Sequence, residues 1–159
     1  MSNLQKISSE ISKIIEIAAA QAHGLSEEET FQLLDDAYSK CIEITGTQDH
    51  VLEVERRVLE WKAKLLCDMN APLVRVEKIL FELEKAGYSD LYCNSNIKTY
   101  YADFCFRNNH KQEGFKALDE IITILNEDLE RMPENSEMQE YFLGYAKELR
   151  DKNLTKLPT

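Results

Sequence analysis

Apolar residues recur at three- and four-residue steps along almost the whole chain. This spacing places them on one face of an α-helix, with polar residues on the opposite face. No segment shows the strict two-residue alternation that is typical of a half-buried strand. The pattern therefore predicts an all-α fold of about seven amphipathic helices, over approximately residues 4–22, 27–44, 48–69, 72–86, 96–109, 112–132 and 136–151.

Residues that favour helix ends separate these segments. Ser26 and Glu29 form a capping box, in which each side chain can accept a hydrogen bond from the other residue's backbone amide. Gly24 suits the left-handed conformation that ends a helix, and Pro72 suits a first helical turn, where its missing amide costs nothing. A loop is expected over residues 89–95, between the fourth and fifth helices.

Two helices have a broad apolar surface. The helix over residues 48–69 has two apolar stripes, so it is predicted to pack on two sides, as a central helix does. The stripes consist of Val51, Val54, Val58, Trp61, Leu65 and Met69, and of Leu52, Leu59, Ala63 and Leu66. In the last helix the residues expected to face inward are Met138, Tyr141, Phe142, Tyr145 and Leu149.

Consecutive helices pair naturally as antiparallel hairpins, which suggests repeats that stack to bury a continuous core. Two hairpins within residues 48–132 place small and apolar residues as tetratricopeptide repeats do: Ala63, Cys67, Leu73, Val76, Leu80 and Leu83, then Ala102, Phe106, Phe115, Ala117, Ile121 and Ile124. The chain thus resembles a degenerate tetratricopeptide-like right-handed array with a C-terminal capping helix. Its repeat of about 39–41 residues exceeds the usual ~34, and Lys64 and Asp103 replace the signature glycine. An irregular helical bundle is the alternative.

Length and composition fit one soluble domain. The 159 residues suggest a single domain over 1–159, with residues 152–159 expected to form a disordered tail. The four cysteines lie far apart, which favours reduced core thiols over a disulfide or metal framework. No apolar run is long enough to span a membrane, and the polar N-terminus has no secretory pattern. We therefore expect a cytoplasmic protein.

The net charge of −10 is unevenly distributed. Residues 1–55 have a net charge of −8, residues 56–116 of +3, and residues 117–159 of −5. Nucleic-acid binding needs a dense cationic patch, so this distribution argues against it. The acidic ends are interpreted as a solvated surface or as a charge-matched docking surface.

The sequence carries no recognisable catalytic or metal-binding motif. His23, His50 and His110 have no cysteine, serine or carboxylate at motif spacing. The acidic run from Glu127 to Glu140 lacks the spacing of a calcium loop. Glycine-rich phosphate loops and nucleophile elbows are also missing. We therefore expect a non-enzymatic protein without a cofactor.

The resemblance implies a binding surface, because the first helices of tetratricopeptide-like hairpins line a concave groove. Trp61, Tyr100 and Arg107 are the expected anchors, since these residue types dominate interface energetics. The full set of positions that it implies is Val58, Trp61, Leu65, Asp68, Met69, Ile97, Tyr100, Phe104, Arg107 and Asn108. Coverage of this face by the first or last helix, as ordinary core, is the alternative.

The preferred functional hypothesis is a protein-interaction module that binds a partner peptide or helix in this aromatic groove. A second hypothesis is a small acidic inhibitor of the immunity or antitoxin kind, which neutralises a basic toxin such as a nuclease. An enzyme with an unrecognised site is a third. The first two differ in the surface used, the groove or the acidic ends, and in their sensitivity to salt.

Overall fold

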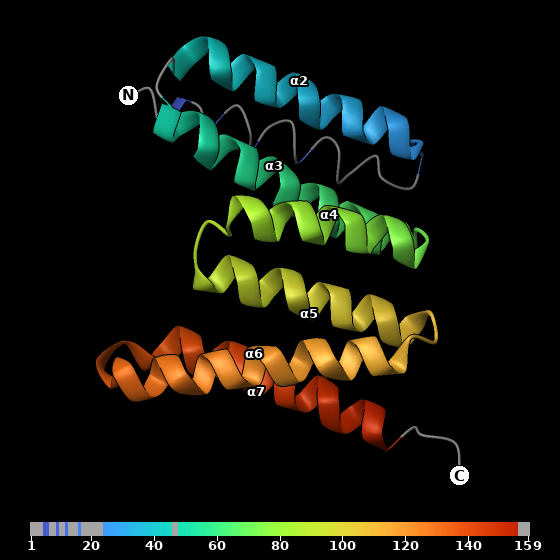
Figure 1. Cartoon of the computed structure of the whole chain (residues 1–159), viewed down its shortest axis with the longest axis vertical. Helices are drawn as coiled ribbons and strands as arrows, with labels where there is room; N and C mark the ends of the chain where they lie inside the picture. The colour runs from blue at the N-terminus through green and yellow to red at the C-terminus, as the bar shows by residue number, and fades with distance from the viewer. Residues whose placement is uncertain are drawn as a thin grey trace. The chain divides into compact units, whose positions relative to one another are not determined.

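The computed structural model of the chain describes residues 24–45 and 48–155, together with residues 5, 6, 9, 12 and 16 (Figure 1). Every regular element in this part of the chain is helical, as the sequence predicted. The helices are α2 (Glu27–Thr45), α3 (Gln48–Asp68), α4 (Leu73–Ala86), α5 (Leu91–Arg107), α6 (Lys111–Arg131), a 3₁₀ turn (Pro133–Asn135) and α7 (Ser136–Leu154). The helix predicted over residues 4–22 lies almost entirely outside the described residues, so the count of seven stays a prediction.

The predicted loop over residues 89–95 is wrong for most of its length, because α5 begins at Leu91. Asp90 caps this helix, since its side chain accepts a hydrogen bond of 2.7 Å from the amide of Cys93. Ser95 and Thr99 are buried one turn apart, and the Thr99 hydroxyl donates to the Ser95 carbonyl at 2.6 Å. The polar composition that resembled a loop therefore belongs to a capped first turn and to buried, hydrogen-bonded hydroxyls.

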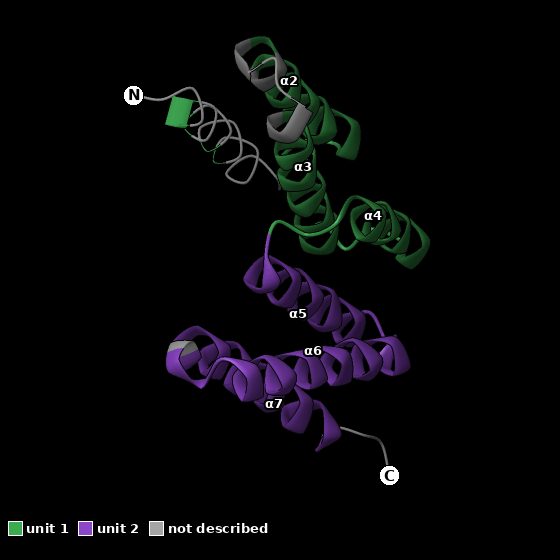
Figure 2. Cartoon of the chain, turned by 60° about the vertical axis from the view of Figure 1, so that its left-hand side comes forward, with its two compact units in different colours: residues 1–89 green, residues 90–159 purple. Residues whose placement is uncertain are grey.

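The chain divides into two compact units, residues 1–89 and residues 90–159 (Figure 2). Each unit is described by itself below. The arrangement of the units as one tetratricopeptide-like array, or as one domain, stays a prediction.

Unit 1 is built around α3, which packs against α2 on one side and α4 on the other. One core cluster joins α2 to α3 and consists of Leu34, Val54, Val58 and Leu65. Ala63 and Leu66, from the second apolar stripe of α3, are also buried. Both sides of α3 are thus buried, as its two stripes predicted.

Polar contacts cap the start of α2 and link this helix to α3 and α4. The amide of Glu29 donates to the Ser26 hydroxyl at 3.1 Å, which confirms the predicted N-cap. Glu27 pairs with Arg75 of α4, and Asp35 pairs with Lys62 of α3 at 2.9 Å. These exposed pairs set the orientation of α2 more than its stability.

Unit 2 is a three-helix assembly in which α5, α6 and α7 run in alternating directions (Figure 1). Its core cluster consists of Ala102, Ala117, Leu118, Ile121, Leu125, Leu143, Ala146 and Leu149. The three alanines contribute little bulk, so they allow the helix axes to approach closely. Arg150 of α7 pairs with Asp119 of α6 at 2.8 Å, outside this core.

Two helical glycines in unit 2 have opposite surroundings. A Cβ atom at Gly114 would lie 2.8 Å from the Phe106 ring, whose edge-to-face contact with Phe115 limits its movement. A Cβ atom at Gly144 would meet nothing within 4 Å. Alanine is a better helix former than glycine by about 1 kcal/mol. The surrounding atoms therefore decide whether each glycine-to-alanine substitution raises or lowers the free energy of unfolding.

We therefore expect Gly144→Ala to raise the free energy of unfolding by about 0.5–1 kcal/mol. Gly114→Ala is expected to lower it by about 1–3 kcal/mol, because the new methyl group overpacks the α5–α6 contact. Urea titrations followed by circular dichroism would measure both. Equal shifts of the same sign would show that the Phe106 ring moves aside at no cost.

Cys67, Cys93 and Cys105 are thiols rather than disulfides in the described part of the chain. Cys67 and Cys105 are buried, as predicted, whereas Cys93 is half-buried near the start of α5. The side chain of Cys41 lies outside the described residues. Among the helices that the structure describes, none is long and apolar enough to cross a membrane.

Candidate functional site

The α3 part of the predicted groove belongs mostly to the core of unit 1. Val58 and Leu65 are buried in the cluster that α3 shares with α2. Trp61 packs against the same cluster but stays partly exposed, and the Lys64 ammonium lies 4.7 Å from the centre of its ring. Asp68 is exposed and Met69 is half-buried. Trp61 is therefore an anchored side chain with one accessible side.

The α5 part of the predicted groove divides into buried and exposed residues. Ile97 and Phe104 are buried, whereas Tyr100 is 38% exposed. Arg107 is exposed and pairs with Asp103 at 3.0 Å within the helix. Tyr100 and Arg107 are seven residues apart, so they lie on the same face of α5.

Asn108 ends α5 and serves the helix itself. Its side-chain amide donates to the Phe104 carbonyl at 2.8 Å, and its backbone amide donates to the carbonyls of Phe104 and Cys105. Since α3 and α5 belong to different units, a groove shared between them stays a prediction.

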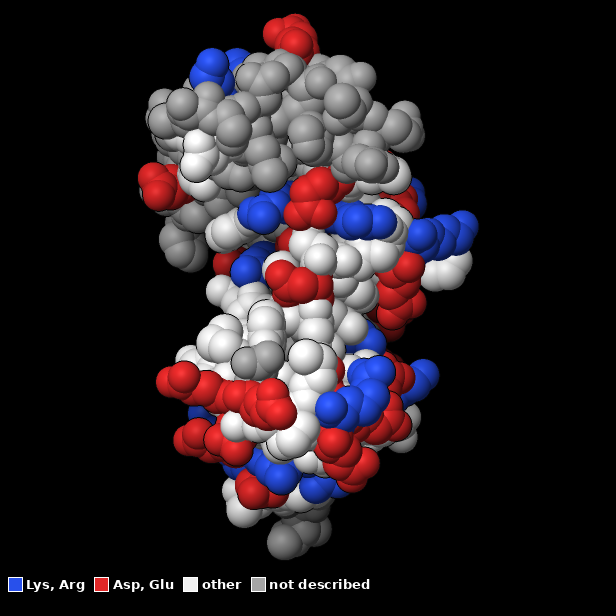
Figure 3. Space-filling view, turned by 90° about the vertical axis from the view of Figure 1, so that its left-hand side faces the viewer, with Lys and Arg blue, Asp and Glu red and all other residues white. Residues whose placement is uncertain are grey.

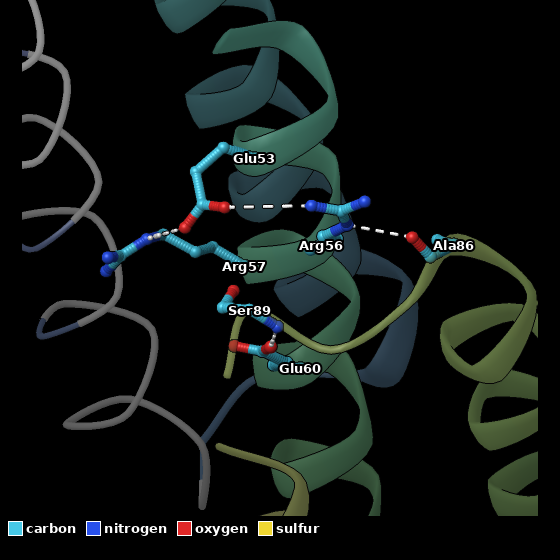
Figure 4. Close-up of polar contacts among 6 residues, drawn as sticks. All are labelled: Glu53, Arg56, Arg57, Glu60, Ala86 and Ser89. Atoms are coloured by element: carbon cyan, nitrogen blue, oxygen red, sulfur yellow. Dashed lines mark hydrogen bonds and ion pairs between the residues drawn. The ribbon is translucent and has the colours of Figure 1, made fainter. Parts of the chain in front are cut away.

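Charged side chains of α3 form a second candidate site, near the end of α4 (Figure 4). Glu53 pairs with Arg57 at 3.3 Å and with Arg56 at 4.0 Å. The Nε of Arg56 also donates to the Ala86 carbonyl at 2.8 Å. That bond satisfies one of the carbonyls left over at a helix end, so Arg56 attaches the end of α4 to α3.

Glu60 completes this attachment from one turn further along α3. Its carboxylate is buried and accepts a hydrogen bond of 2.9 Å from the Ser89 amide (Figure 4). Between the two attachment points Gly87 has a φ of +85°, a conformation that side chains with a Cβ rarely adopt. The charged residues of α3 therefore hold the segment after α4 in place, and this is a structural role.

The remaining titratable groups of the described residues do not suggest a catalytic or metal site. Burial raises the pKa of Tyr38 above its ordinary value, and the charge of nearby Glu55 adds to this shift. Tyr38 packs against the α2–α3 core cluster, where a neutral phenol is a packing group. No group of three or more His, Cys, Asp or Glu residues in the described chain could hold a metal ion.

The feature that sequence reasoning missed is an exposed apolar stripe on α7. Met138, Tyr141 and Tyr145 were expected to face inward, but they are 46%, 67% and 48% exposed. We call these three residues the α7 stripe. They follow one another at steps of three and four residues, so they lie on one face of the helix.

The inward face of α7 is formed instead by Gln139, Leu143, Ala146 and Leu149, which are all buried. Ala146 is small enough for close helix approach, and the Gln139 amide donates to the Asp128 carboxylate of α6 at 2.8 Å. Seven of the twelve residues from 138 to 149 are apolar, too many for a single face. That excess was the signal in the sequence that a second apolar face exists.

The α7 stripe is supported by aromatic side chains beneath it. Tyr141 lies edge-to-face with Phe142, with ring centres 5.4 Å apart. Phe142 stacks in turn on Tyr92 of α5, with ring centres 6.0 Å apart. Such aromatic contacts restrain the rings and thereby lower the conformational entropy that binding would remove.

Carboxylates border the α7 stripe. Residues 133–146 include Glu134, Glu137 and Glu140 but no lysine or arginine, and all three carboxylates are exposed. Over the longer segment 126–146 the net charge is −5, and its one basic residue, Arg131, pairs with Asp128 at 3.7 Å. On the face shown in Figure 3, basic side chains of the described residues lie among acidic ones and form no continuous cationic patch.

No known protein family, curated protein sequence or solved structure shows a significant match to this chain. The function must therefore be inferred from the geometry of the molecule itself.

Proposed function

We propose that this chain is a non-enzymatic protein-binding domain whose contact surface is centred on the α7 stripe. The exposure of Met138, Tyr141 and Tyr145 along one helix face is the observation that carries this proposal. Contiguous exposed apolar residues commonly mark interaction sites, and tyrosine and methionine are enriched at protein interfaces.

The stripe has the structure expected of a binding surface. Tyr141 is backed by Phe142 and Tyr92, so its ring is held in place before a partner arrives. A tyrosine also contributes a large contact area and loses little conformational entropy on binding, because its side chain has few rotatable bonds. Helix faces with anchors at three- and four-residue steps are a common mode of protein recognition.

The test is a comparison of proteins captured from native lysate by three immobilised forms of the chain. The first is the wild type and the second is Tyr141→Ser/Tyr145→Ser. The third, Val74→Ser/Phe81→Ser, is a matched control that removes two exposed apolar residues from α4. We expect one protein to bind the wild type and the control equally, and to bind the α7 variant at least tenfold more weakly.

Two outcomes would contradict the proposal. A captured protein that the α7 variant retains fully does not use the stripe. A captured protein that Tyr100→Ser/Arg107→Ala loses, while the α7 variant retains it, would instead favour the groove predicted from the sequence.

The acidic border of the stripe supports a second candidate function, the charge-complementary inhibitor of a basic protein. The net charge of −5 over residues 126–146 is the observation that favours it. Steering by exposed charges weakens as ionic strength rises. An inhibitor of this kind would lose its partner when Glu134, Glu137 and Glu140 are changed to lysine, even if Tyr141 and Tyr145 are intact.

A further inference from the structure

Gly144 lies in the middle of α7 without an explanation from the fold. It is exposed, it is helical, and a Cβ atom there would meet nothing within 4 Å. The described glycine with positive φ is Gly87, so no special backbone conformation requires glycine at position 144. Glycine in place of alanine destabilises a helix by about 1 kcal/mol. This cost is unexplained unless something outside the described chain uses the space.

The position of Gly144 places that space beside the α7 stripe. Residues three, four and seven apart are neighbours on a helix surface. Gly144 therefore lies next to Glu137, Glu140 and Tyr141 on the preceding turns, and next to Lys147, Glu148 and Asp151 on the following ones. The result is a notch without a side chain, bordered by an aromatic ring, by four carboxylates and by the single cation Lys147, so its border has a net negative charge.

This notch suits a second helix better than an extended chain. Helix axes pack 8–10 Å apart, depending on the side chains at the contact, and a residue without a side chain permits the shorter distance. The stripe from Met138 to Tyr145 covers about two helical turns, roughly 10 Å at 1.5 Å per residue. A partner helix with apolar residues at three- and four-residue steps would match this length.

The charges specify the partner further. Glu137, Glu140 and Glu148 are exposed, and within the described part of unit 2 none of them forms an ion pair. Acidic residues around an apolar stripe attract a helix with lysine or arginine beside its apolar face and repel an acidic one.

We propose that α7 binds a basic amphipathic helix of a partner protein, whose backbone comes closest at Gly144 and whose cationic side chains lie against Glu137, Glu140 and Glu148. This inference rests on the proposed function and names the chemistry of the partner. It also gives a glycine that weakens the helix a role in binding.

The experiment uses two synthetic peptides of 18 residues, labelled with a fluorophore, and the 159-residue chain. Both have leucine at three- and four-residue steps; one has lysine at the other positions and the second has glutamate. Fluorescence anisotropy measures their affinity for the wild type, Gly144→Ala, Gly144→Gln, Tyr141→Ser/Tyr145→Ser and Glu137→Gln/Glu140→Gln/Glu148→Gln. Thermal unfolding of each variant is measured in parallel.

We expect the lysine peptide to bind the wild type and the glutamate peptide to show no binding. Gly144→Gln should weaken binding at least tenfold although its melting temperature does not fall, because glutamine is also a better helix former than glycine. Gly144→Ala should weaken binding less. The triple glutamine variant should bind more weakly and show a smaller dependence on salt.

Several results would overturn this inference. Equal binding of the lysine peptide to the wild type and to Gly144→Gln or Tyr141→Ser/Tyr145→Ser would mean adsorption to negative charge alone. Concentration-dependent dimerisation of the wild type in sedimentation velocity, abolished by Gly144→Gln, would identify a second copy of the chain as the occupant. If neither peptide binds, but a captured protein still depends on Tyr141 and Tyr145, the proposed function stands and the basic helix is wrong.

Discussion

Phe104→Ala is expected to lower the free energy of unfolding by about 3–5 kcal/mol, the usual loss for a large aromatic residue in a core. Phe104 has no exposed surface, and its ring lies 6.4 Å from that of Tyr101 on the same helix. Truncation removes the apolar burial and leaves a cavity that the surrounding helices fill only in part. Guanidinium titration followed by circular dichroism at the helical bands would measure the loss.

Phe81→Ala is the matched control, because it makes the same truncation at a residue that is 58% exposed. Its contact with the Lys85 ammonium, 4.6 Å from the ring centre, is worth about 0.5–1 kcal/mol. We therefore expect the control to lose less than about 1 kcal/mol. If Phe104→Ala lowered the free energy of unfolding as little as this control does, Phe104 would be accessible, as a groove residue would be.

The groove predicted from the sequence thus mixed two kinds of residue. Periodicity identifies the residues that share a face but cannot show whether that face is covered. Val58, Leu65, Ile97 and Phe104 turned out to be buried, while Tyr100 kept an exposed ring. The distinction depends on packing partners that are distant in sequence, and single-chain patterns carry little information about them.

Helix existence was predicted more reliably than helix ends. The helices from α2 to α7 all lie where the apolar steps placed them, because those steps reflect burial against a core. The start of α5 was missed, since serine and asparagine suggested a loop, whereas Asp90 caps the helix and Ser95 is buried. Capping depends on one side chain, so a compositional average conceals it.

The rotation of α7 was the most consequential error. Tyr141 and Tyr145 were placed inward because they are large and apolar, but Leu143, Ala146 and Leu149 occupy the inward face. Both sets have helical spacing, so periodicity could not choose between them. Leucine and alanine carry no polar atom, whereas the tyrosine hydroxyl is hydrated at low cost when exposed. That difference favoured the observed rotation, which leaves the two tyrosine rings exposed.

Leu66→Ala is expected to lower the free energy of unfolding by about 2–5 kcal/mol. Leu66 lies on the second apolar stripe of α3 and has no exposed surface. The helix α3 packs against both α2 and α4. A shift of α3 that filled the cavity on one side would therefore weaken its packing on the other side. Trp61 is the single tryptophan of the chain and lies on the same helix, so its fluorescence reports the unfolding of this region.

Leu154→Ala provides the matched control for this substitution. It removes the same side-chain atoms near the end of α7, where the leucine is 40% exposed. A change within about 0.5 kcal/mol is expected there, as for most surface substitutions. A loss below about 1 kcal/mol at Leu66 would mean that α3 does not bury this stripe, and the two-sided packing of α3 would then be wrong. A loss in the expected range, detected both by Trp61 fluorescence and by circular dichroism, would establish α3 as the central helix of unit 1.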